Sequence, residues 1–165
     1  NGNFDDVRDA VLRSHPWNIA ITRKALPADS STPAFGFSFQ FSLPTDPFCL
    51  RVLSFWNSNV NNDVAAYDSN VMFKIEGRKV LSNEDTCNII YIGRITDTEQ
   101  YDSLLNKAIS ARLAAEIAYN ITGSNSVASN MLTIYEARLK EAKGVDSMEG
   151  FPEQPQADDF TNIRL

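Results

Sequence analysis

The sequence predicts an α+β fold, a helical bundle with an inserted antiparallel β-rich region and an extended C-terminal arm. Three patterns support this prediction. Apolar residues alternate with polar ones in several stretches between residues 17 and 95, as in half-buried strands. Between residues 98 and 143 they recur at three- and four-residue steps, as on one face of a helix. Residues 145–165 follow neither period, so the chain divides into a body, 1–144, and an arm, 145–165.

The body starts with a predicted helix over residues 5–14, whose apolar residues fall on one face. Pro16 ends this helix, because the residue before a proline is disfavoured in the α conformation. Trp17 then begins an alternating segment that predicts the first strand, and a loop follows over residues 24–33. We expect the segment around Trp17 to pack the strands against the later helices.

The clearest alternation predicts a strand over residues 35–43 that Pro44 ends. Its apolar side chains form the core of a sheet or, alternatively, an exposed binding face; the core is the preferred interpretation because exposed apolar stripes promote aggregation. These side chains are Phe35, Phe37, Phe39, Phe41 and Leu43. The residues that we expect to be structural are Trp17, Phe37, Phe39, Pro44 and Asp46.

Three further strands follow from the same pattern. Residues 50–56 predict one, and alternation on both sides of Gly77 predicts a β-hairpin that turns there. A last strand is predicted at about 87–95. The inserted β-rich region thus spans about 17–95.

Two helices are predicted at about 98–122 and 126–143. Asp97 or Thr98 is the expected N-cap of the first, and Gly123 suits its C-terminal end. The short link between the helices makes them antiparallel neighbours.

The charge balance limits the possible partners. The chain has 15 Lys and Arg against 21 Asp and Glu, a formal net charge of −6. Nucleic-acid binding requires clustered basic residues that neutralise phosphates, and the sequence contains no such run. No run of apolar residues approaches the length of a transmembrane helix, so no membrane association is expected.

The sequence offers little support for catalysis. His15 is the sole histidine, and neither Cys49 nor Cys87 lies near it in the sequence. Acidic pairs such as Asp158 and Asp159 resemble glycosidase carboxylates only superficially, since any acidic protein contains such pairs. We therefore predict a protein that is not an enzyme, with no catalytic residues, no cofactor and no metal site.

The arm has two interpretations. Its five acidic residues, two prolines and widely spaced apolar residues cannot form a core of their own. It is therefore either a flexible tail or a docking segment whose apolar residues are buried in another polypeptide. Arg112 and Glu116, four residues apart on a predicted helix, either form an ion pair on a solvated face or contact a neighbour. The predicted interface residues are Phe151, Phe160, Ile163, Leu165, Arg112 and Glu116.

Several blocks of sequence resemble a known family. The first two are His15-Pro16-Trp17-Asn18 and Leu43-Pro44-Thr45-Asp46, and a third is the alanine-rich stretch over residues 108–118. Together they resemble the tail tubular protein A family of short-tailed phages, and the similarity spans most of residues 7–149. The resemblance implies a helical bundle beside a β-rich part.

It also implies a function. Such a protein is a structural component of the virion tail, assembled in the host cytoplasm, and forms a dodecameric adaptor ring that joins the portal to the tail nozzle. The partners implied are further copies of the chain, the portal protein and the nozzle protein, with tail fibres as a further candidate. Genomic DNA would pass through the central channel without specific binding, which suits an acidic protein, because attraction to phosphates would retain the polymer.

Two alternatives from other functional classes stay open. One is a tail-associated polysaccharide hydrolase, which would depend on a pair of the acidic residues. The other is a soluble binding module unrelated to phages, which would be monomeric.

Overall fold

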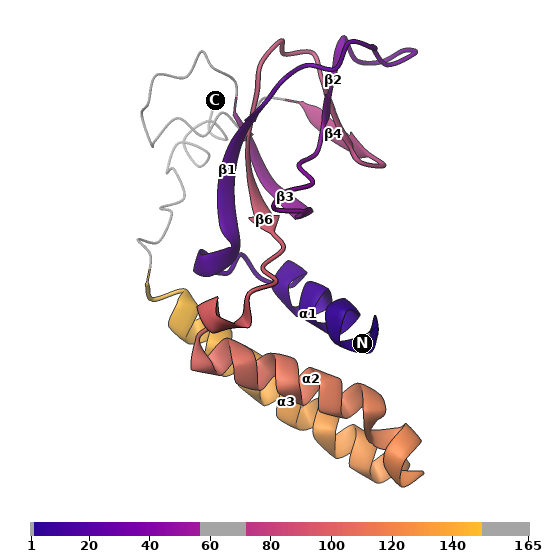
Figure 1. Ribbon diagram of the computed structural model, residues 1–165, viewed down its shortest axis with the longest axis vertical. Coiled ribbons are helices and arrows are strands. Elements are labelled where there is room, and N and C mark those ends of the chain that lie inside the picture. The colour runs from indigo at the N-terminus through magenta and orange to yellow at the C-terminus, as the bar shows by residue number, and fades with distance from the viewer. Residues whose placement is uncertain (1, 57–71, 150–165) are drawn as a thin grey trace, which may run out of the picture.

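The computed structural model describes residues 2–56 and 72–149 of the 165. Within these residues it contains three helices and two three-stranded antiparallel sheets, which confirms the predicted α+β class (Figure 1). The helices are α1 (Gly2–Arg13), α2 (Ser103–Thr122) and α3 (Asn125–Asp146). The strands are β1 (Ile21–Leu26), β2 (Phe39–Ser42), β3 (Cys49–Trp56), β4 (Phe73–Glu76), β5 (Lys79–Ser82) and β6 (Cys87–Gly93).

The last strand in sequence is the middle strand of the first sheet. The strand order of that sheet is β1-β6-β3, and that of the second sheet is β2-β5-β4. β6 pairs with β1 without a break from Ile21 opposite Ile92 to Leu26 opposite Cys87, and with β3 across two irregularities in register. Its central place explains why most of its side chains are buried. The β4–β5 hairpin turns at Gly77, as the sequence predicts. Gly77 has a φ of +58°, a conformation that residues with a side chain rarely adopt.

The prediction of one strand over residues 35–43 is wrong. Gly36 adopts a φ of +86°, which interrupts the extended conformation, and β2 begins only at Phe39. The pairing partner β5 is also only four residues long, so the ladder cannot extend further. As a result Phe41 is buried and Phe39 half-buried, whereas Phe35 is 89% exposed in the preceding loop. Phe37 lies half-buried just before the strand.

The first predicted strand is also placed differently. Residues Asn18–Ala20 form a short 3₁₀ helix, because the backbone N–H of Ala20 donates to the carbonyl of Trp17 at 2.8 Å. β1 then continues to Leu26, into the segment predicted as a loop. Alternate residues share one face of a strand, but an alternation over only Trp17, Ile19 and Ile21 is too short to exclude a single 3₁₀ turn.

The helical hairpin is close to the prediction, with shifted ends. Asp97 caps only a short 3₁₀ turn (Thr98–Gln100), and the N-cap of α2 is Asp102, whose carboxylate accepts from the backbone N–H groups of Leu104 and Leu105. Gly123 ends α2 in the left-handed conformation, as expected. α3 continues past residue 143 to Asp146, so the predicted arm begins inside the helix.

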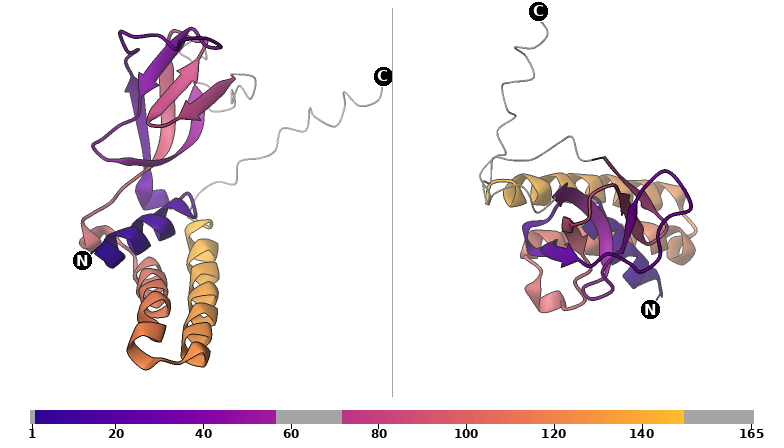
Figure 2. Two further views of the ribbon diagram at one scale, coloured as in Figure 1. Left: turned by 90° about the vertical axis from the view of Figure 1, so that its right-hand side faces the viewer. Right: turned by 90° about the horizontal axis from the view of Figure 1, so that it is seen from above.

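The helix α1 lies between the β-rich part and the α2–α3 hairpin, and the hairpin extends away from the strands (Figures 1 and 2). Trp17 is fully buried in the core cluster that joins all three, and its indole N–H donates to the carbonyl of Val11 at 3.0 Å. The expectation that the Trp17 segment packs strands against helices is thereby confirmed. Among the residues that the structure describes, no helix combines the length and hydrophobicity required to cross a membrane.

Candidate functional site

The predicted structural residues have different surroundings. Trp17 lies in the cluster described above, whereas a second core cluster, which includes Phe41 and Tyr91, fills the β-rich part. Phe39 packs against this cluster, and Pro44 is buried. The carbonyl of Pro44 accepts hydrogen bonds from the guanidinium of Arg78 at 2.7 Å and from the backbone N–H of Cys49 at 3.1 Å. Asp46 is exposed, and its contribution is a backbone carbonyl that accepts from Lys24 at 3.2 Å.

The end of α3 is anchored by a buried carboxylate that no sequence pattern singled out. Asp146 accepts from the backbone N–H of Asn18 at 3.0 Å and lies 3.1 Å from Nε2 of His15. The backbone carbonyl of Asp146 accepts a further hydrogen bond from the side-chain amide Nδ2 of Asn18 at 2.6 Å. Asp146 therefore fastens the C-terminal end of the hairpin to the turn that follows α1, and its side chain is only 7% exposed.

The helix α2 is apolar on more sides than its neighbours cover. Twelve of its 20 residues are hydrophobic, but only Leu105, Ala108, Ile109, Ala111 and Ala118 are buried. A helix that is apolar all round is normally enclosed on all sides. Leu113, Ile117 and Ile121 recur at four-residue steps and so share one side of the last two turns, where exposure rises to 74% at Ile121.

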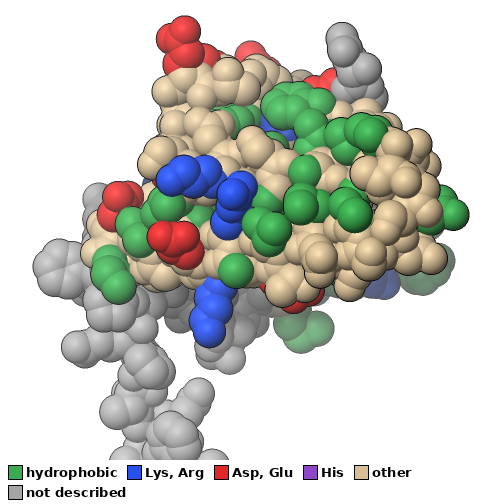
Figure 3. All heavy atoms as spheres, turned by 90° about the horizontal axis from the view of Figure 1, so that it is seen from below, with side chains coloured by type: hydrophobic (Ala, Val, Ile, Leu, Met, Phe, Trp, Pro, Cys, Tyr) green, Lys and Arg blue, Asp and Glu red, His purple; other side chains and the backbone are tan. Residues whose placement is uncertain are grey.

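The partner helix α3 is also poorly enclosed. Its buried residues are only Ala142 and Asp146, and Leu132 and Ile134 are exposed. Seen from the hairpin side, hydrophobic side chains are spread over much of the surface, with a small group of charged side chains at one end (Figure 3). We call the side of α2 that carries the half-buried Ile117 and the exposed Ile121 the hairpin face.

Arg112 and Glu116 lie on the hairpin, but they pair with each other. Nε of Arg112 donates to Glu116 at 2.9 Å, and both side chains are about one-third exposed. The guanidinium of Arg112 also lies 5.3 Å from the ring centre of Tyr135 on α3. The pair therefore bridges the two helices of one chain and leaves part of each side chain accessible. The other four predicted interface residues (Phe151, Phe160, Ile163 and Leu165) lie outside the described residues.

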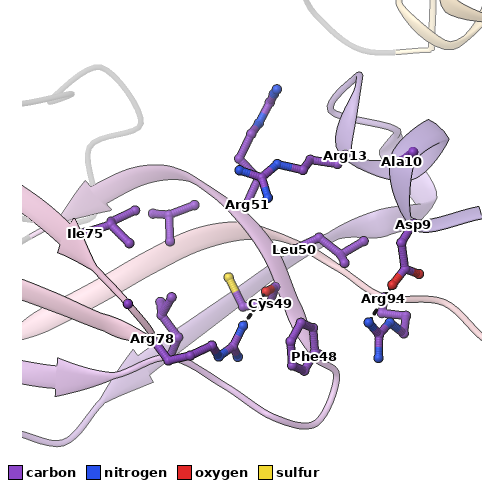
Figure 4. A pocket seen from close by; sticks show the side chains of 13 residues that line it. Asp9, Ala10, Arg13, Phe48, Cys49, Leu50, Arg51, Ile75, Arg78 and Arg94 are labelled. Atoms are coloured by element: carbon purple, nitrogen blue, oxygen red, sulfur yellow. Dashed lines mark hydrogen bonds and ion pairs between the residues drawn. The ribbon is translucent and has the colours of Figure 1, made fainter. Parts of the chain in front are cut away.

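A pocket of about 490 Å³ lies between α1, the start of β3 and the β4–β5 hairpin (Figure 4). Four arginines from four separate segments line it: Arg13, Arg51, Arg78 and Arg94. The sequence contains no basic run, so this group of like charges exists only in the folded chain. We call it the arginine pocket.

Two of the four arginines are held by the protein. Phe48 lies between them, with the guanidinium of Arg78 at 3.9 Å and that of Arg94 at 4.3 Å from its ring centre. Arg78 donates to the carbonyls of Cys49 and Pro44, and Arg94 forms an ion pair with Asp9 of α1. These contacts tie the β-rich part to α1 and shape one side of the pocket.

The two thiols are poor candidates for chemistry. Burial raises the pKa of Cys87 to about 12 and also raises the pKa of Cys49, although the nearby Arg78 and Arg13 oppose the shift at Cys49. A thiol with a raised pKa is mostly protonated at neutral pH and is therefore a weak nucleophile. His15 is held by Asp146 and stacks edge-on against Trp17, far in sequence from both cysteines. Within residues 2–56 and 72–149 no group of three or more metal-ligating side chains occurs.

No protein-family model matches the chain, and no curated protein is significantly similar to it.

Proposed function

We propose that this protein is a structural adaptor that forms a closed ring and joins the portal to the tail nozzle of a short-tailed phage virion. The observation that carries the proposal is the hairpin face. α2 is hydrophobic on nearly all sides, yet α1 and α3 leave the side with Ile117 and Ile121 open. Such a surface is typical of a helix that packs against another subunit.

The sequence blocks described above supply the class of assembly. They resemble adaptor-ring proteins, and the confirmed α+β class agrees with the helical bundle and β-rich part that the resemblance implies. In the proposed ring, the hairpin face packs against neighbouring copies, and residues of the arm contact another polypeptide. The function is structural, and no catalytic step is assigned to it.

The electrostatic character supports a DNA channel without specific binding. The net charge of −6 disfavours retention of a polyanion that must slide. The four arginines of the pocket are a local exception to this acidic character, and two of them are engaged by Asp9 and backbone carbonyls.

The proposal is tested by the mass of the full chain in solution, alone and mixed with its portal, measured by analytical ultracentrifugation and inspected by electron microscopy. We expect a ring in at least the mixture. Ile121→Asp places a charge on the hairpin face and should weaken association roughly 100-fold, because an unpaired charge is costly to bury.

Asn120→Asp is the matched control, since it adds the same charge to the adjacent exposed position of the same helix. It should leave the assembly intact. A wild-type chain that stays monomeric with its portal contradicts the proposal, as does equal assembly of the two variants.

A further inference from the structure

The arginine pocket carries an excess of positive charge in an acidic protein. Its lining contains four arginines and one acidic residue, Asp9, which gives a formal charge of +3. The chain as a whole carries −6. A concentration of charge opposite to that of the whole molecule needs a local explanation.

Only one of the four arginines, Arg94, has an anionic partner among the described residues. Arg78 and Arg94 are engaged as described, but Arg13 and Arg51 have no hydrogen-bond or ion-pair partner among the described residues. Figure 4 shows Arg13 reaching from α1 toward the strand that carries Arg51. Two guanidiniums at one pocket repel each other, so the site is suited to a ligand that carries two neighbouring carboxylates.

The same pocket also has an apolar part. Leu43, Phe48, Leu50 and Ile75 contribute to its lining beside the arginines. Its volume of about 490 Å³ exceeds the roughly 150 Å³ cavity that accommodates an aromatic ring. A ligand that combines two carboxylates with one aromatic side chain therefore matches both halves of the pocket.

We propose that the arginine pocket binds the acidic C-terminal segment of this same polypeptide, residues 150–165. Asp158 and Asp159 pair with Arg13 and Arg51, and the adjacent Phe160 occupies the apolar part. This segment carries three acidic residues and one arginine, a net charge of −2, and it contains the Asp-Asp-Phe sequence that the pocket requires.

The anchor at the end of α3 brings the segment within reach. Asp146 is fastened to His15 and Asn18, and Arg13 of the pocket lies two residues before His15. Residues 147–149 continue α3 as a turn, and from Glu149 to Asp158 an extended chain spans up to about 30 Å. The whole of α1 is about 18 Å long. The contact can therefore close within one chain or be exchanged between two copies. It stands independently of the proposed ring.

Hydrogen exchange of the full-length chain, followed by mass spectrometry of peptides that cover residues 150–165, tests the proposal. We expect slow exchange in the wild type and a roughly tenfold loss of protection in Arg13→Glu/Arg51→Glu, the size expected for two half-exposed ion pairs. Adding Asp158→Arg/Asp159→Arg to that variant should restore protection, because the pairs re-form with opposite signs.

The matched control is Arg23→Glu/Lys140→Glu, which makes the same change in net charge at two exposed positions outside the pocket. Circular dichroism verifies folding of each variant. Should the pocket variant not fold, Asp158→Asn/Asp159→Asn removes the same pairs without altering the pocket and should produce the same loss.

Two outcomes overturn the proposal. The first is a hydrogen-exchange rate at residues 150–165 that is the same in the pocket variant as in the wild type. An equal rise of this rate in the control variant counts as the same outcome. The other is binding of a short DNA duplex that requires Arg13 and Arg51 while the exchange of the segment stays constant, since the pocket would then be a phosphate site.

Discussion

The β-rich part and the α2–α3 hairpin bury their apolar residues to very different extents. In the β-rich part, β6 has a strand on each side, and its residues Ile89, Tyr91 and Ile92 are almost completely buried. In the hairpin, α3 buries only Ala142 and Asp146 over 22 residues. The strand β6 is thus enclosed on both sides, whereas the hairpin leaves Ile121, Leu132 and Ile134 exposed among the described residues. The edge strand β4 of the second sheet is exposed as well, so the contrast is between the first sheet and the hairpin.

The difference follows from the position of α1. This helix packs with Trp17 and Leu105 at the end of the hairpin that is nearest the strands (Figure 2). The rest of the hairpin has no third helix beside it among the described residues, so each of its helices is covered by the other alone. Stability should therefore be concentrated at the junction and decrease along the hairpin.

The largest expected effect is at the junction. Trp17→Ala removes a fully buried indole and its hydrogen bond to Val11, and should lower the free energy of unfolding by about 3–5 kcal/mol. Urea denaturation monitored by circular dichroism measures the change. A loss below about 1 kcal/mol would mean that the junction is not the main core.

The second-largest loss of stability is expected at Asp146, which anchors the end of α3. Asp146→Ala removes a buried carboxylate that accepts the part-buried hydrogen bond from the Asn18 N–H, which should cost about 1–3 kcal/mol. Glu149→Ala, three residues further and exposed, is the control and should be close to neutral. Similar values for both variants would show that the end of α3 is not held by this carboxylate.

A smaller effect is expected at an ion pair of the second sheet. The hydrogen bond from Lys79 holds the pKa of Asp29 below its ordinary value of 3.8, an effect that burial partly opposes. Because the pKa of Asp29 is lower in the folded state, the ion pair stabilises the fold above about pH 4. This stabilisation is lost as the pH falls through the pKa of Asp29 in the folded state. Asp29→Asn should therefore reduce stability by less than about 1 kcal/mol at pH 7 and by less still at pH 3, in denaturation curves at the two pH values.

The smallest effect is expected on the hairpin face. Ile121→Ala changes a side chain that is 74% exposed and should alter the unfolding free energy of the dilute monomer by no more than about 0.5 kcal/mol. A cost above about 2 kcal/mol would show that this residue is already covered within one chain, and the contrast between the two regions would fail.

Local chemistry made much of the fold predictable. Gly77 and Gly123 mark a hairpin turn and a helix end through the positive φ that each adopts, and both positions were predicted. The errors arose where the conformation of a single residue decided the boundary of an element, because the spacing of apolar residues does not report such conformations. Gly36 interrupts an alternation that continues on both sides of it, and Asp102 caps α2 in place of Asp97.

The candidate sites were less predictable. The four arginines of the pocket are separated by 16 to 38 residues in the sequence, so only the antiparallel pairing and the position of α1 bring them together. Asp146 was assigned to the arm because residues 145–165 follow neither the helical nor the strand period, although it is a buried anchor. The open side of α2 could have been predicted from the sequence. Twelve of its 20 residues are hydrophobic, which is more than a helix needs for contact with two neighbouring elements.

The bond network around Asp146 has a mechanical consequence. Tension applied to the chain beyond α3 is transmitted through Asp146 to His15 and Asn18, which lie between the end of α1 and the start of β1. The tip of the hairpin near Gly123 lies at the opposite end of α3 and stays outside that line of force.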